Sequence, residues 1–341
     1  MKSIETLKVM ESAFGNRTST RHAAARGVKR TEQGTQHTFV VLDLAVSRRI
    51  LTSKSFTSFN YFDEGVRRLE ASGTPMSCMQ RFFDQGLLFQ EGPQHHAAKQ
   101  ELIRILDRET TRLEALSSRV ATFMAKRSGR IDNPLDLSRL FVRLCIGLVV
   151  AHLTSISLLS AIRLLRAREN IFYFHFHPRR QQRMNKLLSE LDNMIMASGR
   201  SPRYDNARIL TESLLTMGYD PLVGTLCAYL TDDDAGEIVS APDRYCATSF
   251  VSRVCVERIC ITGHQFKVGD ICYVALVPAV DEEASAGAFP FGLGAHTCIG
   301  KRFSISVLRL AEGVFRQSPP AEFKRMPVVC ADGAFLSFEH E

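Results

Sequence analysis

The sequence predicts a mainly α-helical protein with a small β region. Apolar residues recur at helical spacing through residues 110–200 and again through 208–230. An apolar segment at Phe39–Leu42 and an alternating segment at 252–276, with turn signals at Gly263 and Gly269, predict the strands. A glycine-rich loop that contains Cys298 precedes one more helical pattern, ISVLRLAEGVF. These observations together favour a helical body with a strand-rich corner.

Composition places the chain among soluble globular proteins. Of its 341 residues, 45% are hydrophobic and 23% are charged, which is enough to build a substantial core. We find no uninterrupted apolar run of about 18 residues, so no membrane anchor is expected, and the first residues do not look like a secretory signal. The nine cysteines are scattered without CxxC pairs, which indicates reduced thiols and a cytoplasmic protein.

We expect one catalytic domain preceded by a flexible end. Residues 1–36 are polar and contain the linker-like stretch RHAAARGVKRTEQGTQH, so this N-terminal segment is expected to be flexible. Residues 37–341 show no repeat, no low-complexity block and no hinge, and they are expected to form a single domain. That domain begins with the strand at Phe39–Leu42 and a short helix carrying Val46, Ile50 and Leu51.

The net charge of +7 indicates which classes of binding partner the protein could have. A basic balance suits nucleic acid, an anionic membrane or an acidic protein. The basic residues are dispersed, and no zinc-finger or helix-turn-helix spacing is present, so nucleic acid is not expected. An acidic protein partner fits better.

A helix is predicted to start near the Gly92-Pro93 turn, because proline is favoured at the first helical position. His95 and Lys99 are four residues apart and therefore project from one face of this helix. Two donors on one face suit a carboxylate. The alternative is a solvated pair with no ligand.

The helical region 110–200 includes an apolar run between 137 and 169 that we interpret as a buried core helix, too short and interrupted for a membrane span. It is followed by IFYFHFHPRR, in which His175 and His177 would share one face of a strand and could bind a metal. No third ligand is evident. The surrounding aromatic residues favour a packed core or the roof of a pocket.

The helical pattern through 208–230 is interrupted at Gly218 and Pro221. Proline removes one i→i−4 hydrogen bond, so a kink is predicted there. Asp220 lies at the break. An acid at a kinked helix suits a functional site, and the alternative is an ordinary surface carboxylate.

The stretch FPFGLGAHTCIGKRF, residues 289–303, carries the strongest chemical signal. Glycines at 292 and 294 permit a tight turn and close approach to a flat partner. Cys298 is predicted to lie just before a helix N-terminus, which would lower the thiol pKa and favour the thiolate. A thiolate presented in this way can ligate haem iron. The alternative is a buried structural cysteine.

Phe291, Gly294, Cys298 and Gly300 fit the pattern F-x-x-G-x-x-x-C-x-G, which resembles the haem-binding signature of the cytochrome P-450 family of haem-thiolate monooxygenases. The resemblance extends over residues 38–340, with the His95 and Gly218 motifs in the family's order. It implies a triangular helical prism with haem b between the long central helix and the Cys298 loop. It also implies oxidation or hydroxylation of a small organic substrate, such as a biosynthetic intermediate of secondary metabolism.

The resemblance implies roles for individual residues. Cys298 would ligate the iron, with Phe291, Gly294 and Gly300 shaping its loop. Gly218 would open the central helix for dioxygen, and Asp220 would feed protons. The haem propionates would be held by a set of four basic residues: His95, Lys99 (where arginine is usual), Arg253 and His296.

Besides Lys99, the chain departs from the family pattern in further ways. Pro221 replaces the usual threonine, and no Glu-x-x-Arg pair lies between Asp220 and Arg253. Glu101-x-x-Arg104 and Glu109-x-x-Arg112 have that spacing but lie elsewhere in the chain. The Asp220–Arg253 segment is also shorter than the family's by about one helix. The resemblance is therefore to a compact, atypical member.

The implied electron source is NAD(P)H through separate redox partners, since no flavin or nicotinamide motif is present. An acidic ferredoxin or flavodoxin would dock on a basic face made of Lys301, Arg302, Arg104 and Arg108. Solvated, scattered charges are the alternative. Pro221 keeps two other functions open: a peroxide-using or non-oxygenating haem-thiolate enzyme, performing for example ring closure, coupling or dehydration, and a haem-binding protein without catalysis.

Overall fold

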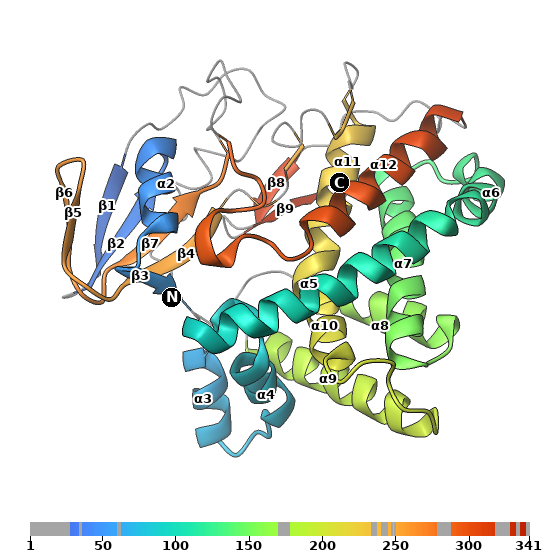
Figure 1. Cartoon of the computed structure of the whole chain (residues 1–341), viewed down its shortest axis with the longest axis horizontal. Helices are drawn as coiled ribbons and strands as arrows, with labels where there is room; N and C mark the ends of the chain where they lie inside the picture. Colours follow the sequence, from blue (N-terminus) through green and yellow to red (C-terminus); the bar gives the residue numbers. More distant parts are fainter. Residues whose placement is uncertain are drawn as a thin grey trace.

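The protein combines a helical body with a five-stranded sheet at one side, as seen in a computed structural model (Figure 1). The residues described are 28–33, 36–59, 63–169, 178–232, 237–239, 245–246, 248, 250–277, 288–317, 328–331 and 335–338. His175 and His177, proposed as a metal pair, lie outside them. The mainly α architecture with a small β region confirms the predicted fold class.

The helical body is built from segments whose apolar faces the sequence pattern predicts. Its α-helices are α2 Leu44–Thr52, α3 Asp63–Ala71, α4 Ser77–Gln85, α5 Gly92–Ala115, α6 Ser117–Ser128, α7 Pro134–Thr154, α8 Leu158–Glu169, α9 Pro178–Ala197, α10 Ala207–Ser213, α11 Tyr219–Leu230 and α12 Lys301–Gln317. Two 3₁₀ turns, η1 Leu87–Phe89 and η3 Gly294–His296, and one π-helical turn, η2 Leu214–Gly218, complete it. In Figure 1, α5 and α12 run side by side across the middle of the molecule.

The sheet joins the start of the chain to its C-terminal third. Its strands are β1 Val28–Gln33, β2 Gln36–Val41, β3 Phe56–Ser58, β4 Phe250–Cys255 and β7 Ile271–Ala275, in the order β1-β2-β7-β4-β3. The β2–β7 pair is parallel and the other pairs are antiparallel. Two separate hairpins lie outside this sheet, β5 Ile259–Ile261 with β6 His264–Phe266, and β8 Val328–Ala331 with β9 Phe335–Phe338.

The predicted turns at Gly263 and Gly269 are confirmed. Thr262 and Gly263 both have positive φ, 48° and 84°, which is the backbone of a two-residue hairpin turn between β5 and β6. Gly269, with φ of 90°, turns the chain into β7. The short N-terminal helix is confirmed as α2, which buries Val46, Ile50 and Leu51.

The N-terminal segment 1–36, which was expected to be flexible, contains strand β1 and the first residue of β2. Residues 28–33 were expected to be flexible, but they form strand β1 and pair with β2 from Val28↔Val41 to Gln33↔Gln36. Polar residues suit this position because β1 is an edge strand with only β2 beside it. Residues 1–27 lie outside the described part of the chain.

Helix α7 is the centre of the helical core. Phe141, Ile146 and Val150 are fully buried, and α7 packs against α8, α10 and α11. By length and composition alone α7 could cross a membrane, so the expectation that this segment is too short was wrong. Most of its apolar window is nevertheless packed inside the protein, which confirms a buried core helix, although the predicted stretch 137–169 is divided after Thr154 into the two helices α7 and α8.

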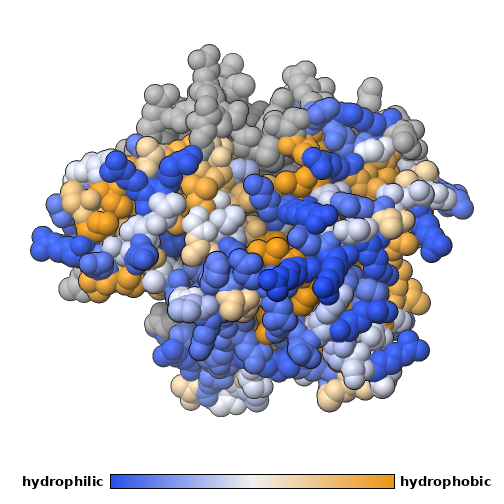
Figure 2. Space-filling view, in the orientation of Figure 1, coloured by the Kyte–Doolittle hydropathy of each residue, from blue (hydrophilic) through white to orange (hydrophobic). Residues whose placement is uncertain are grey.

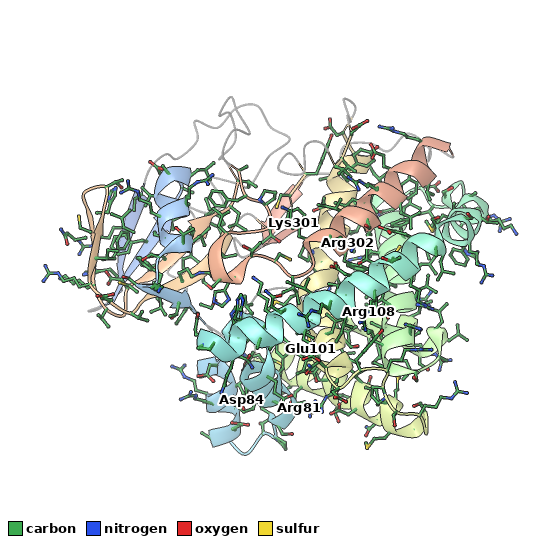
Figure 3. All side chains as sticks on the ribbon, in the orientation of Figure 1. Arg81, Asp84, Glu101, Arg108, Lys301 and Arg302 are labelled. Carbon is green, nitrogen blue, oxygen red and sulfur yellow. The ribbon has the colours of Figure 1, made fainter. Side chains whose placement is uncertain are left out.

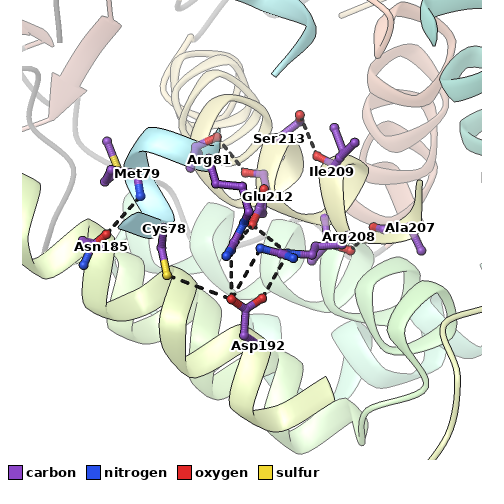
Figure 4. Close-up of polar contacts among 12 residues, drawn as sticks. Cys78, Met79, Arg81, Asn185, Asp192, Ala207, Arg208, Ile209, Glu212 and Ser213 are labelled. Carbon is purple, nitrogen blue, oxygen red and sulfur yellow. Dashed lines mark hydrogen bonds and ion pairs between the residues drawn. The ribbon is translucent and has the colours of Figure 1, made fainter. Parts of the chain in front are cut away.

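A half-buried charge cluster, in which only Glu212 is fully buried, ties α4, α9 and α10 together (Figure 4). Arg81 lies 2.9 Å from Asp192 and 3.0 Å from Glu212. Arg208 lies 3.0 Å from Asp192 and 3.2 Å from Glu212. The Glu212 side chain is 1% exposed, and burial raises its pKa to about 7, although the nearby Arg81 lowers it. The folded protein therefore binds a proton at Glu212 more tightly than the unfolded chain does.

Glu212 should make stability depend on pH. Its carboxyl has an ordinary pKa of 4.5, so its stabilising contribution is complete below that value and is lost as the pH rises through about 7. We expect replacement by glutamine to change the difference in unfolding free energy between wild type and variant by about 2 kcal/mol from pH 5 to pH 8. Urea unfolding followed by circular dichroism measures this difference. Parallel pH curves for wild type and Glu212→Gln would contradict it, and Glu101→Gln on the exposed face of α5 is the control.

Candidate functional site

The Cys298 loop is held by backbone geometry that favours glycine. Gly292 and Gly294 have φ of 71° and 70°, and a Cβ on Gly294 would stand 2.5 Å from the carbonyl oxygen of Leu51 at the end of α2. The N–H of Cys298 donates to the carbonyl oxygen of Phe291 at 2.8 Å. Helix α12 begins at Lys301, which confirms that Cys298 lies just before a helix.

The pKa of the Cys298 thiol differs from expectation. The side chain is accessible from a cavity, yet the surrounding protein desolvates the thiol and raises its pKa. The backbone N–H of Gly300 and the ammonium group of Lys99 oppose this shift without overcoming it. The expected lowering of this pKa by the helix N-terminus is therefore wrong. Binding of a metal ion to the sulfur would favour the thiolate again.

The thiol faces a cavity of about 350 Å³ between α5, η2, β4 and the start of α12. Its walls are mostly apolar and include Leu87, Met217, Leu222 and Leu308. Such a cavity, with a few polar groups at one side, is the usual form of a small-molecule or cofactor site. The helix break at η2 and the Cys298 loop both contribute to it.

The polar side of the cavity brings together the four basic residues proposed from sequence: His95, Lys99, Arg253 and His296. The rings of His95 and His296 lie 4.7 Å apart. Lys99 Nζ donates to the carbonyl oxygen of Ala295 at 2.5 Å. His296 Nε2 lies 2.9 Å from Glu91 Oε1, an oxygen that also accepts the N–H of Ser58 at 3.1 Å.

This basic cluster has more hydrogen-bond donors than acceptors. Arg253 is 5% exposed, and one N–H donates to the carbonyl oxygen of Ser252 at 2.8 Å. Burial lowers the pKa of Arg253 to about 10 and also lowers the pKa values of His95 and His296. His296 Nδ1 is buried and has no hydrogen-bond partner among the described residues. A buried cation and an unpaired ring nitrogen are costly unless an anionic ligand completes them.

The predicted interruption of the central helix is confirmed as the π-helical turn η2, between α10 and α11. Pro221 is the third residue of α11, where its missing N–H cannot continue the α-helical ladder. Gly218 and Pro221 both line the cavity. A π turn is frequent at functional sites because it re-aims the side chains of one helical turn.

Asp220 is not among the residues that line the cavity. Both of its carboxylate oxygens accept hydrogen bonds from the guanidinium of Arg168 in α8. Arg168 is fully buried, donates through Nε to the carbonyl oxygen of Leu215 at 2.6 Å, and lies over the ring of Tyr219. The sequence did not point to Arg168, because its partner is 52 residues away and other arginines stand beside it.

Three of the basic residues proposed for a partner surface lie together. Figure 3 shows Lys301 and Arg302 at the start of α12 beside Arg108 of α5. Arg104 is one helical turn before Arg108 and is also exposed. Arg302 lies 3.6 Å from Asp107, so this basic face is partly neutralised at one point. Hydrophilic residues predominate over α5 and the start of α12 (Figure 2).

The motif Glu109-x-x-Arg112 forms an ion pair of 3.7 Å within α5, and Glu109 also contacts His152 of α7 at 2.8 Å. It therefore braces α5 against α7. Most residues from 233 to 249, where a Glu-x-x-Arg helix is missing from the sequence, lie outside the described part. No group of metal-binding side chains is found among the described residues.

Comparison with solved structures shows that the chain has the cytochrome P-450 fold. The tirandamycin C-bound monooxygenase TamI matches at a TM-score of 0.67 and 14% identity, covering 92% of each chain. TxtC, described for sequential aliphatic and aromatic thaxtomin hydroxylation, matches at 0.63 and 14%, covering 96% of this chain and 98% of its own. RauA, solved with a biosynthetic intermediate of aurachin RE, matches at 0.60 and 13%, covering 89% and 91%. No protein-family model and no curated protein matches the sequence.

Proposed function

We propose that this chain, which has the cytochrome P-450 fold, binds haem b through Cys298 and oxidises a small organic substrate as a haem-thiolate monooxygenase. The observation that carries the proposal is the juxtaposition of a thiol and an incompletely paired basic cluster within one apolar cavity. The thiol suits the iron. The cluster suits the two propionates at the edge of the same flat ligand.

The residues of the basic cluster fit two carboxylates. Lys99 and Arg253 supply the permanent charge, while His296 Nδ1 offers a buried ring nitrogen that lacks a partner among the described residues. With Nε2–H donated to Glu91, the ring can also donate from Nδ1 to a propionate only as the imidazolium, which an added carboxylate would favour. Glu91 accepts from His296 Nε2 and would fix the ring for this contact.

Thiolate-ligated haem, when bound, supplies the dioxygen and one-electron chemistry that protein side chains lack. The chain supplies the surroundings for it. The apolar walls at Leu87, Met217, Leu222 and Leu308 would hold the substrate and exclude water. Gly218 leaves one side of η2 without a side chain, so a small molecule can approach the helix there.

The residues that would deliver protons are those in which this chain differs most from the pattern of the family it resembles. Pro221 lines the cavity where a hydroxyl is usual, and Asp220 is held by both oxygens on Arg168. These two observations favour a second candidate, a haem-thiolate enzyme that uses peroxide or performs a non-oxygenating step such as ring closure, coupling or dehydration. Asp220 contributes to the site in our proposal only if its pair with Arg168 opens. A haem-binding protein without catalysis is the remaining alternative.

Electrons for the monooxygenase would come from NAD(P)H through a separate acidic ferredoxin or flavodoxin. The exposed side chains of Lys301, Arg302, Arg104 and Arg108 offer it a positively charged face on the side of the Cys298 loop. Association through such a face weakens as salt is added, because exposed charges are screened. The substrate is proposed to be a biosynthetic intermediate, in line with the ligand of RauA, and the protein is proposed to work in the cytoplasm.

Turnover assays test the choice between these functions. The haem-loaded protein is incubated with apolar probe substrates, either with NADPH, a surrogate ferredoxin and its reductase, or with hydrogen peroxide alone. Products with the first system support the monooxygenase, and products with peroxide alone support the second candidate. Stoichiometric haem without any product would leave a non-catalytic haem protein, and no haem binding would reject the proposal.

Arg253 offers a sharper test of the propionate site. Arg253→Leu should weaken haem binding about 10- to 100-fold, since a charged hydrogen bond contributes about 1.5–3 kcal/mol. The haem-free variant should be no less stable than the wild type, because the removed guanidinium is buried without a carboxylate at ion-pair distance among the described residues, and the longer-range attraction of Glu91 does not offset its desolvation. Haem titration and urea unfolding measure the two effects. Equal haem affinity of Arg253→Leu and of the exposed control Arg258→Leu would contradict this assignment.

A further inference from the structure

Strand β3 ends at the polar side of the cavity, beside the start of α5 (Figure 1). Its last residue, Ser58, lines the cavity. The hydroxyl oxygen of Ser58 is buried and has no hydrogen-bond partner among the described residues. A buried hydroxyl in this state has lost its hydrogen bonds to water without replacement, which is costly. A ligand that accepts a hydrogen bond from Ser58 would remove that cost.

The Ser58 hydroxyl lies next to the buried guanidinium of Arg253. In the antiparallel pairing of β3 with β4, Ser58 is directly opposite Arg253. Residues in this relation project from the same face of the sheet, with Cβ atoms about 4.5–5.5 Å apart. Arg253 also lines the cavity, and one of its N–H groups donates to the carbonyl oxygen of Ser252. The wall therefore offers an O–H donor and a cation side by side, a combination that suits a carboxylate.

Glu91 fixes the backbone of Ser58 against the rest of this wall. It occupies the N-cap position of α5, yet its side chain makes no capping hydrogen bond. Its Oε1 instead accepts the N–H of Ser58 at 3.1 Å and lies 2.9 Å from Nε2 of His296. One carboxylate oxygen thus holds β3 and η3 together at the start of α5. With its backbone fixed, Ser58 aims its hydroxyl by rotation about the Cα–Cβ bond.

We propose that Ser58 is a further binding residue of the cavity, whose hydroxyl turns toward a carboxylate held by Arg253 and donates a hydrogen bond to it. The inference rests on the proposed function, because this carboxylate is either a propionate of the haem or the acid group of a substrate in the same cavity. An uncharged ligand group fits less well, since it would leave the buried Arg253 without a counter-charge.

The first measurement is titration of the haem-free full chain with haem b and with haem dimethyl ester, in which both propionates are esterified. Ser58→Ala should bind haem b about tenfold more weakly than the wild type does, because it lacks one hydrogen bond to a charged group. It should bind the dimethyl ester within about threefold of the wild type, because an ester carbonyl is a weaker, neutral acceptor.

Ser55→Ala is the matched control for this change. Ser55 is three residues earlier, is 8% exposed and does not line the cavity. Its hydroxyl donates to Glu257 Oε2 at 3.1 Å. Ser55→Ala should keep the wild-type affinity for haem b but be less stable, because it loses an existing hydrogen bond. The haem-free Ser58→Ala chain should be no less stable than the wild type in urea unfolding, because its hydroxyl has no partner to lose among the described residues.

The second measurement detects a carboxylate that belongs to the substrate. Decanoate has one carboxylate on an apolar chain, and its binding to the haem-loaded protein is followed by the optical spectrum, with decanol as the uncharged comparison. About tenfold weaker binding of decanoate to Ser58→Ala, with unchanged affinity for haem b and for decanol, would assign the hydroxyl to the substrate instead of to a propionate.

Failure of this inference is distinguishable from failure of the proposed function. Wild-type affinity of Ser58→Ala for both haem b and decanoate would overturn the inference and leave the proposed function standing. Equal weakening toward haem b and its dimethyl ester, or a haem-free Ser58→Ala chain as destabilised as Ser55→Ala, would also overturn it, because either result indicates a structural hydroxyl. A wild type that takes up no haem would overturn the proposed function and this inference with it.

Discussion

Replacement of Cys298 by serine is expected to remove sulfur from the coordination of the bound iron and to reduce turnover at least about a hundredfold. Outer-sphere partners of a metal ligand already change activity by about 10- to 100-fold, and the ligand itself should matter more. Haem should still enter the cavity, more weakly, because the basic cluster proposed to hold its propionates remains intact. X-ray absorption at the iron edge detects the loss of the sulfur neighbour.

Cys260→Ser is the matched control for this change. Cys260 is also exposed, lies on strand β5, and does not line the cavity. It should keep both the iron–sulfur signal and turnover. A sulfur neighbour that persists in Cys298→Ser would show that another residue ligates the iron.

Replacement of Gly294 by alanine is expected to destabilise the fold by about 3 kcal/mol and to lower haem retention. The positive φ of 70° costs an alanine about 1–2 kcal/mol, and its Cβ would lie 2.5 Å from the carbonyl oxygen of Leu51. That oxygen belongs to the backbone of α2 and cannot rotate away, so η3 must shift and carry the Cys298 loop with it. Relief of such a clash costs a further 1–3 kcal/mol or so.

Replacement of Gly292 by alanine separates the cost of the positive φ from the cost of the clash with Leu51. Gly292 has nearly the same φ, 71°, but a Cβ there would stand 3.7 Å from the nearest atom, an ordinary contact. Gly292→Ala should therefore cost only about 1–2 kcal/mol. Urea unfolding of both variants measures the difference. Equal losses at 292 and 294 would mean that the contact with Leu51 does not position the loop.

Local sequence patterns predict the parts of the site that are contiguous in the chain. The Cys298 loop, the start of α5 at Gly92 and the break at Gly218 each depend on backbone preferences of nearby residues, and all three are confirmed. That the four basic residues share one cavity wall was expected only through the family resemblance. The structure brings them together because α5, β4 and η3 meet there.

Contacts between distant helices were not predictable in this way. The pairs Arg168–Asp220 and Glu114–Ser306 join residues far apart in the sequence, and no periodicity marks one arginine or glutamate among many. The thiol pKa was misjudged for a related reason. A helix N-terminus can be inferred from the pattern, whereas desolvation of Cys298 depends on everything packed around it.

The absorption spectrum of the reduced, haem-loaded protein under carbon monoxide tests the central claim most directly. Thiolate ligation by Cys298 predicts a strongly red-shifted Soret band in the wild type and in Cys260→Ser, and its absence in Cys298→Ser. A band of the histidine-ligated type in the wild type, or a purified protein that takes up no haem, would contradict the account.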